Sequence, residues 1–334
     1  MSLPPIEIPL GAMRFNSDSQ KLEYWNGGAW FQIHTFSPNL DGGARVICAG
    51  GIDSPATKDV IDFATASSAG NFIDFGDLVS SATFVCAGSG SSRTRGVMGA
   101  YSNTIQFITI SSTGNSVDFG DFNTTNNRLQ MGAVSSETRG VFAGGYFPQP
   151  SHTNVMEFIT IAATGNALDF GDLIENNRGN ASYGSPTRGV FHAGKSNPAG
   201  ILNRIQDITI ATTGNSTDFG DATEAKDFCA GGSNATRGVV TGGRTPNASD
   251  VIEFTTIATK GNAVRFGNLI TSVDEHCASA TSTRGFSLGG TPTPERNVVE
   301  YISIATGGTA ADFGDLTVKR SHCTSFTNAH GGLG

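Results

Sequence analysis

The sequence has little charge and no long apolar segment. Only 15% of the 334 residues are charged, the net charge is −8, and no basic cluster occurs that could bind a phosphate backbone. No stretch approaches the roughly 20 apolar residues that a membrane-spanning helix needs, and the N-terminus lacks a signal-peptide pattern. We therefore expect a soluble chain with no nucleic-acid partner and no membrane insertion.

A composition that favours helices is also missing. The 44 glycines and the small polar residues are typical of tightly turned β structure. One motif, Gly-Asn-x-x-Asp-Phe-Gly-Asp, recurs along the chain and degenerates in the last two of six copies. Its phenylalanines are 44 to 51 residues apart, at Phe75, Phe119, Phe170, Phe219, Phe266 and Phe313. This spacing is the length of a four-stranded propeller blade.

A second motif, Thr-Arg-Gly or a variant of it, precedes each copy of the first. It runs into an apolar strand that ends in a small-residue pair such as Gly144-Gly145, and a second apolar strand such as Val155–Ile161 follows. A Thr-Gly-Asn turn, whose Gly and Asn tolerate positive φ, then leads into the Asp-Phe-Gly-Asp strand. With a small-residue strand before the next Thr-Arg-Gly, each repeat supplies four strands.

The two ends of the chain complement each other. The last segment, His322–Gly332, resembles the small-residue strand that starts at His276, and the repeat then stops. The first repeat begins at its second strand, Ala44–Gly51, and lacks a first strand of its own. We predict that the C-terminal strand completes the first sheet, which closes a ring and removes open sheet edges.

Three features resemble kelch-type repeats: the blade length, the glycine pairs, and a basic residue after the Asp-Phe-Gly-Asp strand. The basic residues are Arg128, Arg178, Lys226 and Arg320. The resemblance covers about residues 44–334 and implies an all-β fold, a six-bladed β-propeller whose C-terminal strand closes the first blade. Kelch repeats carry Tyr and Trp where this sequence has Phe75 and its equivalents. The expected domains are a small N-terminal β-meander, residues 1–40, and the propeller, residues 41–334.

Residues 1–40 do not share the repeat. They contain three predicted strands, Ala12–Asn16, Lys21–Trp25 and Ala29–Ile33. So short a module cannot bury enough surface to be stable alone, and its aromatic side chains need a partner. That partner is either the propeller or, as we favour, other copies of the chain. The residues assigned to oligomerisation and attachment are Phe15, Tyr24, Trp25, Trp30 and Phe31.

The same segment resembles a short motif of bacteriophage tail fibres and related virion proteins. The shared pattern is a Gly-x-x-Arg-Phe-Asn strand at Gly11–Asn16, then Leu-Glu-Tyr-Trp-Asn-Gly at Leu22–Gly27, and then Trp30. The Asp-Phe-Gly-Asp repeats also resemble those of large structural proteins in phages of marine bacteria. Together these resemblances imply a virion protein that is assembled in the host cytoplasm and is commonly trimeric.

The repeated acids are the strongest candidates for chemistry, because paired carboxylates could bind calcium or act as acid and base. Identical pairs spread around a ring cannot converge on one substrate, however, so we expect them to cap turns and to pair with the repeated arginines. The fifth repeat has Arg265 and Asn268 instead. The pairs are Asp74/Asp77, Asp118/Asp121, Asp169/Asp172, Asp218/Asp221 and Asp312/Asp315.

The repeated arginines form a matching basic ring. For them we expect a salt bridge or a carbonyl contact to the next blade, and anion binding is the alternative. These residues are Arg45, Arg95, Arg139, Arg188, Arg237 and Arg284.

The five cysteines and six histidines lack the spacing of metal ligands. Cys86, Cys229, Cys277 and Cys323 each follow a repeated phenylalanine by 10 or 11 residues, which places them at matching positions in different repeats. Such residues rarely meet, and only Cys48 and Cys323 could be brought together by pairing of the chain ends. We expect free thiols and no metal or cofactor. With no nucleophile motif, phosphate loop or sialidase-type Asp box, we expect that the chain is not an enzyme.

The loops between the second and third strands differ most among the repeats. They should emerge on one propeller face together with the loops between blades, and a rigid scaffold with one variable face is a common basis for a binding site. Neutral insertions are the alternative. The residues of the predicted receptor-binding face are Tyr101, Tyr146, Phe147, His152, Lys195, Asn197, Arg244, Asn247 and Arg296.

These observations favour a tail-fibre or appendage component of a phage. Its propeller would bind a host-surface glycan or protein, and residues 1–40 would contact other virion proteins. The alternative is a capsid or neck decoration protein that binds other virion proteins. A third interpretation is a glycan-processing enzyme.

Overall fold

The structure, a computed structural model, describes residues 8–16, 21–32, 44–79, 90–99, 103–123, 128–147, 151–291 and 294–333. The chain divides into two compact units, Met1–Gly43 and Ala44–Gly334. In the described ranges every regular element is a β-strand except a single 3-10 turn, η1 (Gly331–Leu333). The predicted all-β fold is confirmed.

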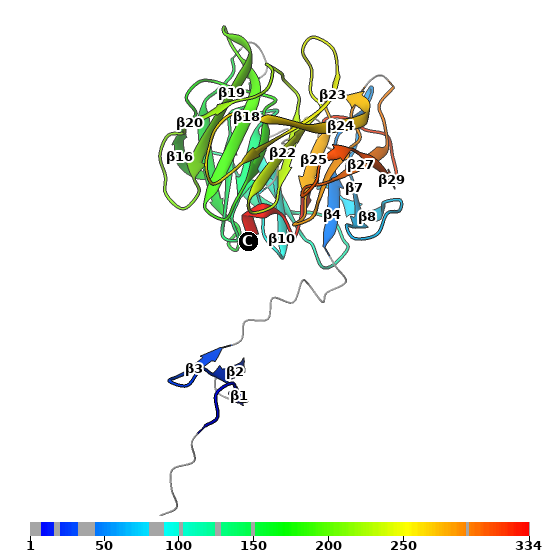
Figure 1. Cartoon of the computed structure of the whole chain (residues 1–334). Helices are drawn as coiled ribbons and strands as arrows, with labels where there is room; N and C mark the ends of the chain where they lie inside the picture. Colours follow the sequence, from blue (N-terminus) through cyan, green and yellow to red (C-terminus); the bar gives the residue numbers. More distant parts are fainter. Residues whose placement is uncertain are drawn as a thin grey trace, which may run out of the picture. The chain divides into compact units, whose positions relative to one another are not determined.

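The second unit contains six antiparallel sheets, numbered here along the chain, with strands given in hydrogen-bonded order (Figure 1). Sheet 1 has β30 (Thr324–Thr327), β4 (Arg45–Ala49), β7 (Val60–Thr65) and β8 (Ile73–Asp77). Sheet 2 has β9 (Gly90–Ser91), β10 (Arg95–Gly99), β11 (Thr104–Thr109) and β12 (Val117–Asp121). Sheet 3 has β13 (Gly132–Ser135), β14 (Arg139–Ala143), β15 (Val155–Thr160) and β16 (Leu168–Asp172).

The remaining sheets repeat this order. Sheet 4 has β17 (Ala181–Gly184), β18 (Arg188–Ser196), β19 (Gly200–Thr209) and β20 (Thr217–Asp221). Sheet 5 has β21 (Ala230–Ser233), β22 (Arg237–Thr241), β23 (Ser249–Thr256), β24 (Val264–Val273) and the parallel strand β28 (Gly308–Thr309). Sheet 6 has β25 (Cys277–Ala280), β26 (Arg284–Leu288), β27 (Val298–Ser303) and β29 (Ala311–Asp315). A separate hairpin joins β5 (Ile52–Asp53) to β6 (Ala56–Thr57).

The C-terminal strand completes the first sheet, as predicted. In this pairing β30 is antiparallel to β4, with Phe326 opposite Ile47. Figure 1 shows the blue strands of sheet 1 beside the orange strands of sheet 6. The first strand of sheet 1 therefore comes from the end of the chain, whereas the other five sheets take theirs from the segment just before their second strand.

The apolar core lies between neighbouring sheets. Phe75 of sheet 1 packs with Met98 and Ile108 of sheet 2, and Phe313 of sheet 6 packs with Val46 of sheet 1. Both phenylalanines are only 2% exposed. Because burial of such a side chain contributes roughly 1.5–3 kcal/mol, the repeated phenylalanines hold each sheet against the next, including the last against the first.

Backbone hydrogen bonds connect the fourth strand of each sheet to the turn before the fourth strand of the following sheet. In every case an amide of the turn donates to a carbonyl of the preceding sheet at 2.8 or 2.9 Å. The bonds are Ser116 to Asp77, Ala167 to Asp121, Ser216 to Asp172, Ala263 to Asp221, Ala310 to Asn268 and Phe72 to Asp315. The last of these joins sheet 1 to sheet 6, so the six bonds form one cycle.

This close approach explains the glycine of Asp-Phe-Gly-Asp. Gly76 has a φ of 147°, and a Cβ there would lie 2.5 Å from the backbone of Gly114 in the next turn. At Gly314 the same atom would lie 2.4 Å from the carbonyl oxygen of Gly70. Real Cβ atoms do not approach backbone this closely, so the motif requires glycine for contact between sheets as well as for its positive φ.

The repeated arginines form a second cycle. Each guanidinium group donates through Nη1 to a main-chain carbonyl at the end of the third strand of the next sheet, for example from Arg45 to Ile110 at 2.7 Å and from Arg284 of sheet 6 to Ala66 of sheet 1 at 2.9 Å. Most of these groups also stack on an aromatic ring of their own sheet, as Arg95 does on Phe107 at 4.7 Å. The expected carbonyl contact is confirmed.

The expected pairing of these arginines with the Asp-Phe-Gly-Asp acids is wrong. Among the described residues, none of these acids forms an ion pair with a repeated arginine. The guanidinium groups bond to main-chain carbonyl groups instead. The main chain of the motif is capped instead by the asparagine of the next turn. The Asp77 amide, for instance, donates to Asn115 Oδ1 at 3.0 Å.

Ion pairs are buried inside three of the sheets. Arg128 donates to Glu157 at 2.8 Å, and Arg320 and Lys226 likewise contact Asp62 and Glu253. All six side chains are at most 2% exposed. Such pairs offset a large desolvation cost only while both partners are present.

Sheet 4 has two neutral residues in place of the buried ions. The residue at the position of Arg128 is Asn177, and the residue at the position of Glu157 is Gln206; both are buried. Sheet 4 therefore lacks the charged residue at both of these positions. Arg178, which the sequence spacing grouped with Arg128, lies one position later and is half-buried at the surface. That assignment is corrected.

The cysteines also depart from expectation. Cys277 is the first residue of β25 and pairs with Leu288, whereas Cys323 precedes β30 and corresponds to Cys229. Cys277 is thus one position later than the spacing indicated. Even so, Cys277 and Cys323 meet, with their sulfur atoms 2.9 Å apart. Cys86 lies outside the described residues.

The first unit is an antiparallel sheet of β1 (Met13–Asn16), β2 (Lys21–Trp25) and β3 (Trp30–Gln32), close to the predicted strands. Strand alternation divides the five predicted aromatic residues between its two faces. Phe15, Tyr24 and Phe31 share an exposed apolar face with Met13 and Leu22.

The other face of this N-terminal sheet is partly covered by its own side chains. Trp25 and Trp30 lie on it with ring centroids 5.6 Å apart, and Arg14 stacks over Trp30. Arg14 also pairs with the buried Glu23 at 2.9 Å. The two tryptophans are half-buried, whereas the side chains on the opposite face are exposed among the described residues of this unit.

We predict that Glu157→Gln destabilises the protein by about 3–5 kcal/mol, because it removes the carboxylate charge that compensates the buried Arg128. The double variant Arg128→Asn/Glu157→Gln copies the two neutral residues of sheet 4 and should recover most of this loss. Chemical denaturation of the three proteins measures the difference. A double variant as unstable as Glu157→Gln would contradict the assignment.

Candidate functional site

The loops between second and third strands lie beside the segments that connect the sheets, as predicted. In sheets 3 to 6 a residue near or just beyond the end of the second strand pairs with one that precedes the first strand: Tyr146 with Leu129, Lys195 with Arg178, Arg244 with Asp227, and Thr291 with Asp274. We call this side of the second unit the loop face. Its residues come from sheets that are far apart in the sequence.

A ring of residues in the left-handed conformation lies on the loop face, with φ between 52° and 62°. It contains Gln130, Gly179, Phe228, Glu275 and His322. The amide of each of the last four donates to the carbonyl of the preceding member at 2.7 to 3.3 Å. These five residues, together with Cys229, His276 and Cys323, line a small pocket. The main chain is repeated, but the side chains differ at every position.

Phe228 is the centre of a cation–π cluster. The guanidinium groups of Arg178 and Arg244 lie 5.1 and 4.4 Å from its ring centroid. Arg178 also lies over the Tyr146 ring at 5.3 Å and donates to His152 Nε2 at 3.1 Å. Burial and the neighbouring positive charges lower the pKa of His152, which keeps the ring neutral and able to accept this bond.

Acidic side chains surround the exposed end of this cluster. Arg244 lies within 3.5 Å of carboxylate oxygens of Asp227, Asp274 and Glu275. Glu275 is also 3.0 Å from His322. Burial, the largest single influence, opposes ionisation of Glu275, but the interactions with His322, Arg244 and Arg178 together outweigh it and lower the pKa of the carboxyl. The cluster therefore presents both charges and two aromatic rings close together.

The structure brings together part of the predicted face. Tyr146, His152 and Arg244 belong to the cluster, and Lys195 joins it through backbone bonds to Arg178. Phe147 is half-buried in the same loop as Tyr146.

The other predicted residues of this face lie apart from the cluster. Asn197 and Asn247 are exposed next to Pro198 and Pro246. Arg296 pairs with Glu300 at 3.1 Å and so compensates the charge of that buried carboxylate. Tyr101 lies outside the described residues.

Sequence reasoning missed four residues of the cluster: Arg178, Phe228, Glu275 and His322. Three of these occupy one position of the repeat, two residues before the first strand, where every described repeat carries a different side chain. This variation among the repeats was the feature of the sequence that could have indicated the cluster. It could not be recognised in the sequence, because the segments between sheets differ in length and cannot be aligned without the strand register.

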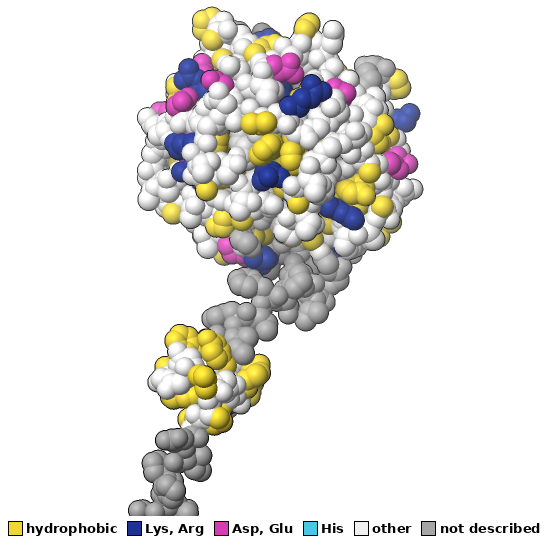
Figure 2. Space-filling view, in the orientation of Figure 1, with side chains coloured by type: hydrophobic (Ala, Val, Ile, Leu, Met, Phe, Trp, Pro, Cys, Tyr) yellow, Lys and Arg dark blue, Asp and Glu magenta, His cyan; other side chains and the backbone are white. Residues whose placement is uncertain are grey.

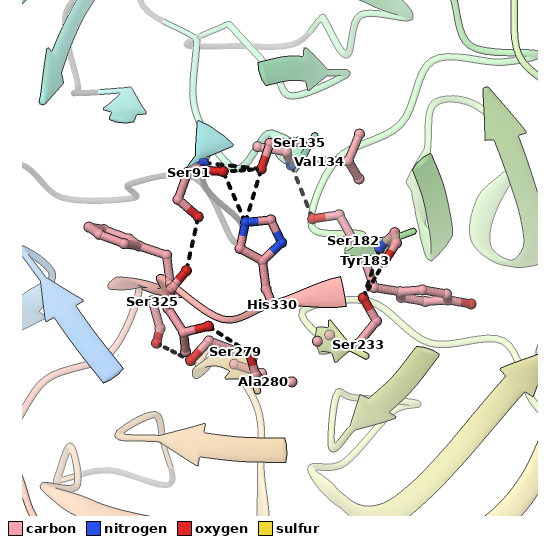
Figure 3. Close-up of a pocket in the computed structure, with 17 residues that line it drawn as sticks. Ser91, Val134, Ser135, Ser182, Tyr183, Ser233, Ser279, Ala280, Ser325 and His330 are labelled. Atoms are coloured by element: carbon pink, nitrogen blue, oxygen red, sulfur yellow. Dashed lines mark hydrogen bonds between the residues drawn. The ribbon is translucent and has the colours of Figure 1, made fainter. Parts of the chain in front are cut away.

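A second pocket, the central pocket, is lined by β9, β13, β17, β21, β25 and β30, the first strands of all six sheets (Figure 3). Its serine side chains bond neighbouring sheets to each other. Ser135 Oγ accepts from the Ser91 amide at 3.1 Å and donates to the Ser91 carbonyl at 2.9 Å, and Ser233 bonds to Gly184 in the same way. These hydroxyl groups satisfy strand edges that would otherwise lack partners.

His330 points into the central pocket from the C-terminal segment (Figure 3). Its Nδ1 accepts from the Gly332 amide at 3.1 Å, so the proton is on Nε2, which donates to the Ser91 carbonyl at 2.9 Å. Ser135 Oγ is 3.5 Å from Nε2. In this tautomer the ring cannot take a proton from Ser135, and the pair does not form an activated nucleophile.

No family model matches the sequence, and no curated protein matches it either. Across the described ranges, no helix is long and apolar enough to cross a bilayer.

We predict that the free energy of unfolding decreases as the pH falls below about 6.5, the pKa of unfolded histidine. Burial lowers the pKa of His276 to about 3 and that of His330 to about 4, so the unfolded chain binds protons that the folded chain does not. Their stabilisation is complete above pH 6.5 and is lost as the pH falls to these values. The double variant His276→Asn/His330→Asn should flatten the profile between pH 6 and 4 in acid-unfolding experiments. An unchanged slope would contradict this origin.

Proposed function

We propose that residues 44–334 form a closed six-bladed β-propeller and that the chain is a binding protein without enzymatic activity. The two hydrogen-bond cycles support closure, because each includes a bond between sheet 6 and sheet 1: Phe72 to Asp315 in one, Arg284 to Ala66 in the other. The phenylalanine core that spans the same boundary also supports it.

The observation that carries the binding proposal is the cluster of Tyr146, Arg178, Phe228 and Arg244 on the loop face. Aromatic rings and arginines are the side chains most often found at binding hot spots, because they offer apolar area and directed polar contacts at once. The cluster is built on a main-chain ring that repeats, while its side chains do not. This combination is that of a rigid scaffold with a variable binding surface.

We further propose that the chain is a phage virion protein, of the tail-fibre or appendage kind, and that the loop face binds a host-surface glycan or protein. This proposal relies on the resemblance of Gly11–Trp30 to the tail-fibre motif. The N-terminal sheet would connect the propeller to other virion proteins and to further copies of the chain, with a trimer favoured. The hydrophobic side chains that cover much of this unit support the assignment (Figure 2).

We predict that Arg244→Ala weakens binding of the full-length protein to host cells or to an arrayed bacterial surface glycan by roughly tenfold or more, because it removes a hot-spot side chain. Arg265→Ala removes an exposed arginine from the degenerate fifth motif and serves as the matched control. Arg265→Ala should unfold like the parent, and Arg244→Ala should remain folded with a lower midpoint of thermal unfolding, because the buried Asp227 and Asp274 lose an ion-pair partner.

Tight binding to purified capsid or neck proteins, with no binding to cells or glycans, would support the decoration protein and overturn the appendage proposal. Equal binding by Arg244→Ala and the parent would remove the cluster from the site.

We predict that Phe15→Ser/Phe31→Ser reduces the oligomer to a monomer in analytical ultracentrifugation, because it places hydroxyl groups on the exposed face of the N-terminal sheet. Phe15 and Phe31 are 66% and 47% exposed, which leaves them free to contact another copy. Ile73→Ser removes an exposed apolar side chain from sheet 1 and should change nothing. An oligomer that survives the double variant would refute the assignment of this face.

A further inference from the structure

Three cysteines from distant parts of the chain lie side by side. Cys48 belongs to β4 of sheet 1, Cys277 to β25 of sheet 6, and Cys323 to the segment that leads into the C-terminal strand β30. The Cys277 sulfur is 2.9 Å from that of Cys323 and 3.7 Å from that of Cys48. All three sulfurs lie within 4.8 Å of one another, and the side chains are at most 2% exposed.

The donor set is purely sulfur. Among the described residues, no histidine or carboxylate completes the group within that distance. Thiolates select soft cations, chiefly Cu(I) and Zn(II). Protein zinc sites are almost always four-coordinate, with water as the fourth ligand when the protein supplies three. The described residues supply three sulfurs and no fourth donor, so the donor number favours an ion that is stable with three sulfur ligands.

We propose that Cys48, Cys277 and Cys323 form a trigonal binding site for a soft monovalent metal ion, Cu(I), where sheet 1, sheet 6 and the C-terminal strand meet.

The spacing of the sulfurs suits such a site. An ion with metal–sulfur bonds of about 2.3 Å in a trigonal plane separates its ligands by about 4.0 Å. The observed separations are 2.9 and 3.7 Å, and the third is no longer than 4.8 Å. Binding therefore requires the Cys277 and Cys323 sulfurs to separate by about 1.1 Å.

The charge around the site also suits a thiolate cluster. Binding of Cu(I) displaces the thiol protons, which leave as three protons when all three sulfurs ionise, and gives an anionic centre. Burial is the largest influence on the pKa of Cys48 and raises it, whereas the charge of Arg320, which is fully buried and paired with Asp62, lowers the pKa of both Cys48 and Cys323. In the described structure the Arg320 Nε has no hydrogen-bond partner. A buried cation with a spare donor beside three sulfurs lowers the cost of ionising them.

A bound ion would link separate parts of the fold and stabilise it. One ion would join the second strand of sheet 1, the first strand of sheet 6 and the segment that leads into β30, so it would fasten the two ends of the sheet array to each other. A ligand that binds only the folded state stabilises it in proportion to the logarithm of its free concentration. Because the three side chains are buried, loading should be slower in the folded chain than during refolding.

The test uses the reduced full-length chain, refolded under nitrogen with Cu(I) buffered by a chromophoric chelator. We expect one copper per chain, a sulfur-to-copper charge-transfer absorption in the near ultraviolet, and a rise in the midpoint of thermal unfolding. Cys277→Ala places at this position the residue that sheets 4 and 5 already carry there, Ala181 and Ala230, so it should fold. It should bind Cu(I) at least about tenfold more weakly and lose the thermal shift.

Cys229→Ala is the matched control, because Cys229 is also buried and occupies the position of Cys323 in sheet 5, away from the cluster. It should retain copper. Failure of the parent chain to compete with the chelator would overturn the proposal, as would equal binding by Cys277→Ala. A mass two hydrogens lower than the reduced chain, with a Cys277–Cys323 disulfide formed before any metal is added and copper excluded, would also overturn it.

Discussion

The close approach of backbone between neighbouring sheets is the constraint on which the rest of this structure depends. At Gly76 and its equivalents the chain passes so near to the next turn that a Cβ would meet main-chain atoms at about 2.5 Å. The same approach lets each turn donate its amides to the preceding sheet. Three residue types therefore recur together: glycine leaves space for the neighbouring backbone, asparagine caps the strand, and phenylalanine fills the core.

Buried charge imposes a second constraint inside the sheets. Arg128 with Glu157 and Asn177 with Gln206 occupy equivalent places, so in sheets 3 and 4 the fold accepts either an ion pair or two neutral residues there. This follows from the cost of an unpaired charge without water. Sheet 6 reaches the same balance differently, since Arg296 of a loop pairs with Glu300. The repeat thus conserves charge compensation, while the residues that provide it change.

Variation is concentrated where the main chain needs no particular side chain. The ring that contains Phe228 and Glu275 is held by amide and carbonyl groups, and the left-handed conformation recurs there with five different residues. A surface built in this way can change its chemistry without altering the scaffold, which is why we place the binding site there. The serines of the central pocket show the opposite case, because their hydroxyl groups are bonded between strands.

The sequence by itself determined the number of repeats, the strand order within each repeat and the pairing of the chain's two ends, because periodic motifs report local structure and its repetition directly. It also identified part of the loop face from differences in loop length. Only the tertiary structure decided that Arg178 belongs to the surface, that Phe228 lies between two arginines, and that Cys277 meets Cys323. Such contacts depend on a register shift of one residue and on which sheets are neighbours in space, and neither leaves a periodic trace along the chain.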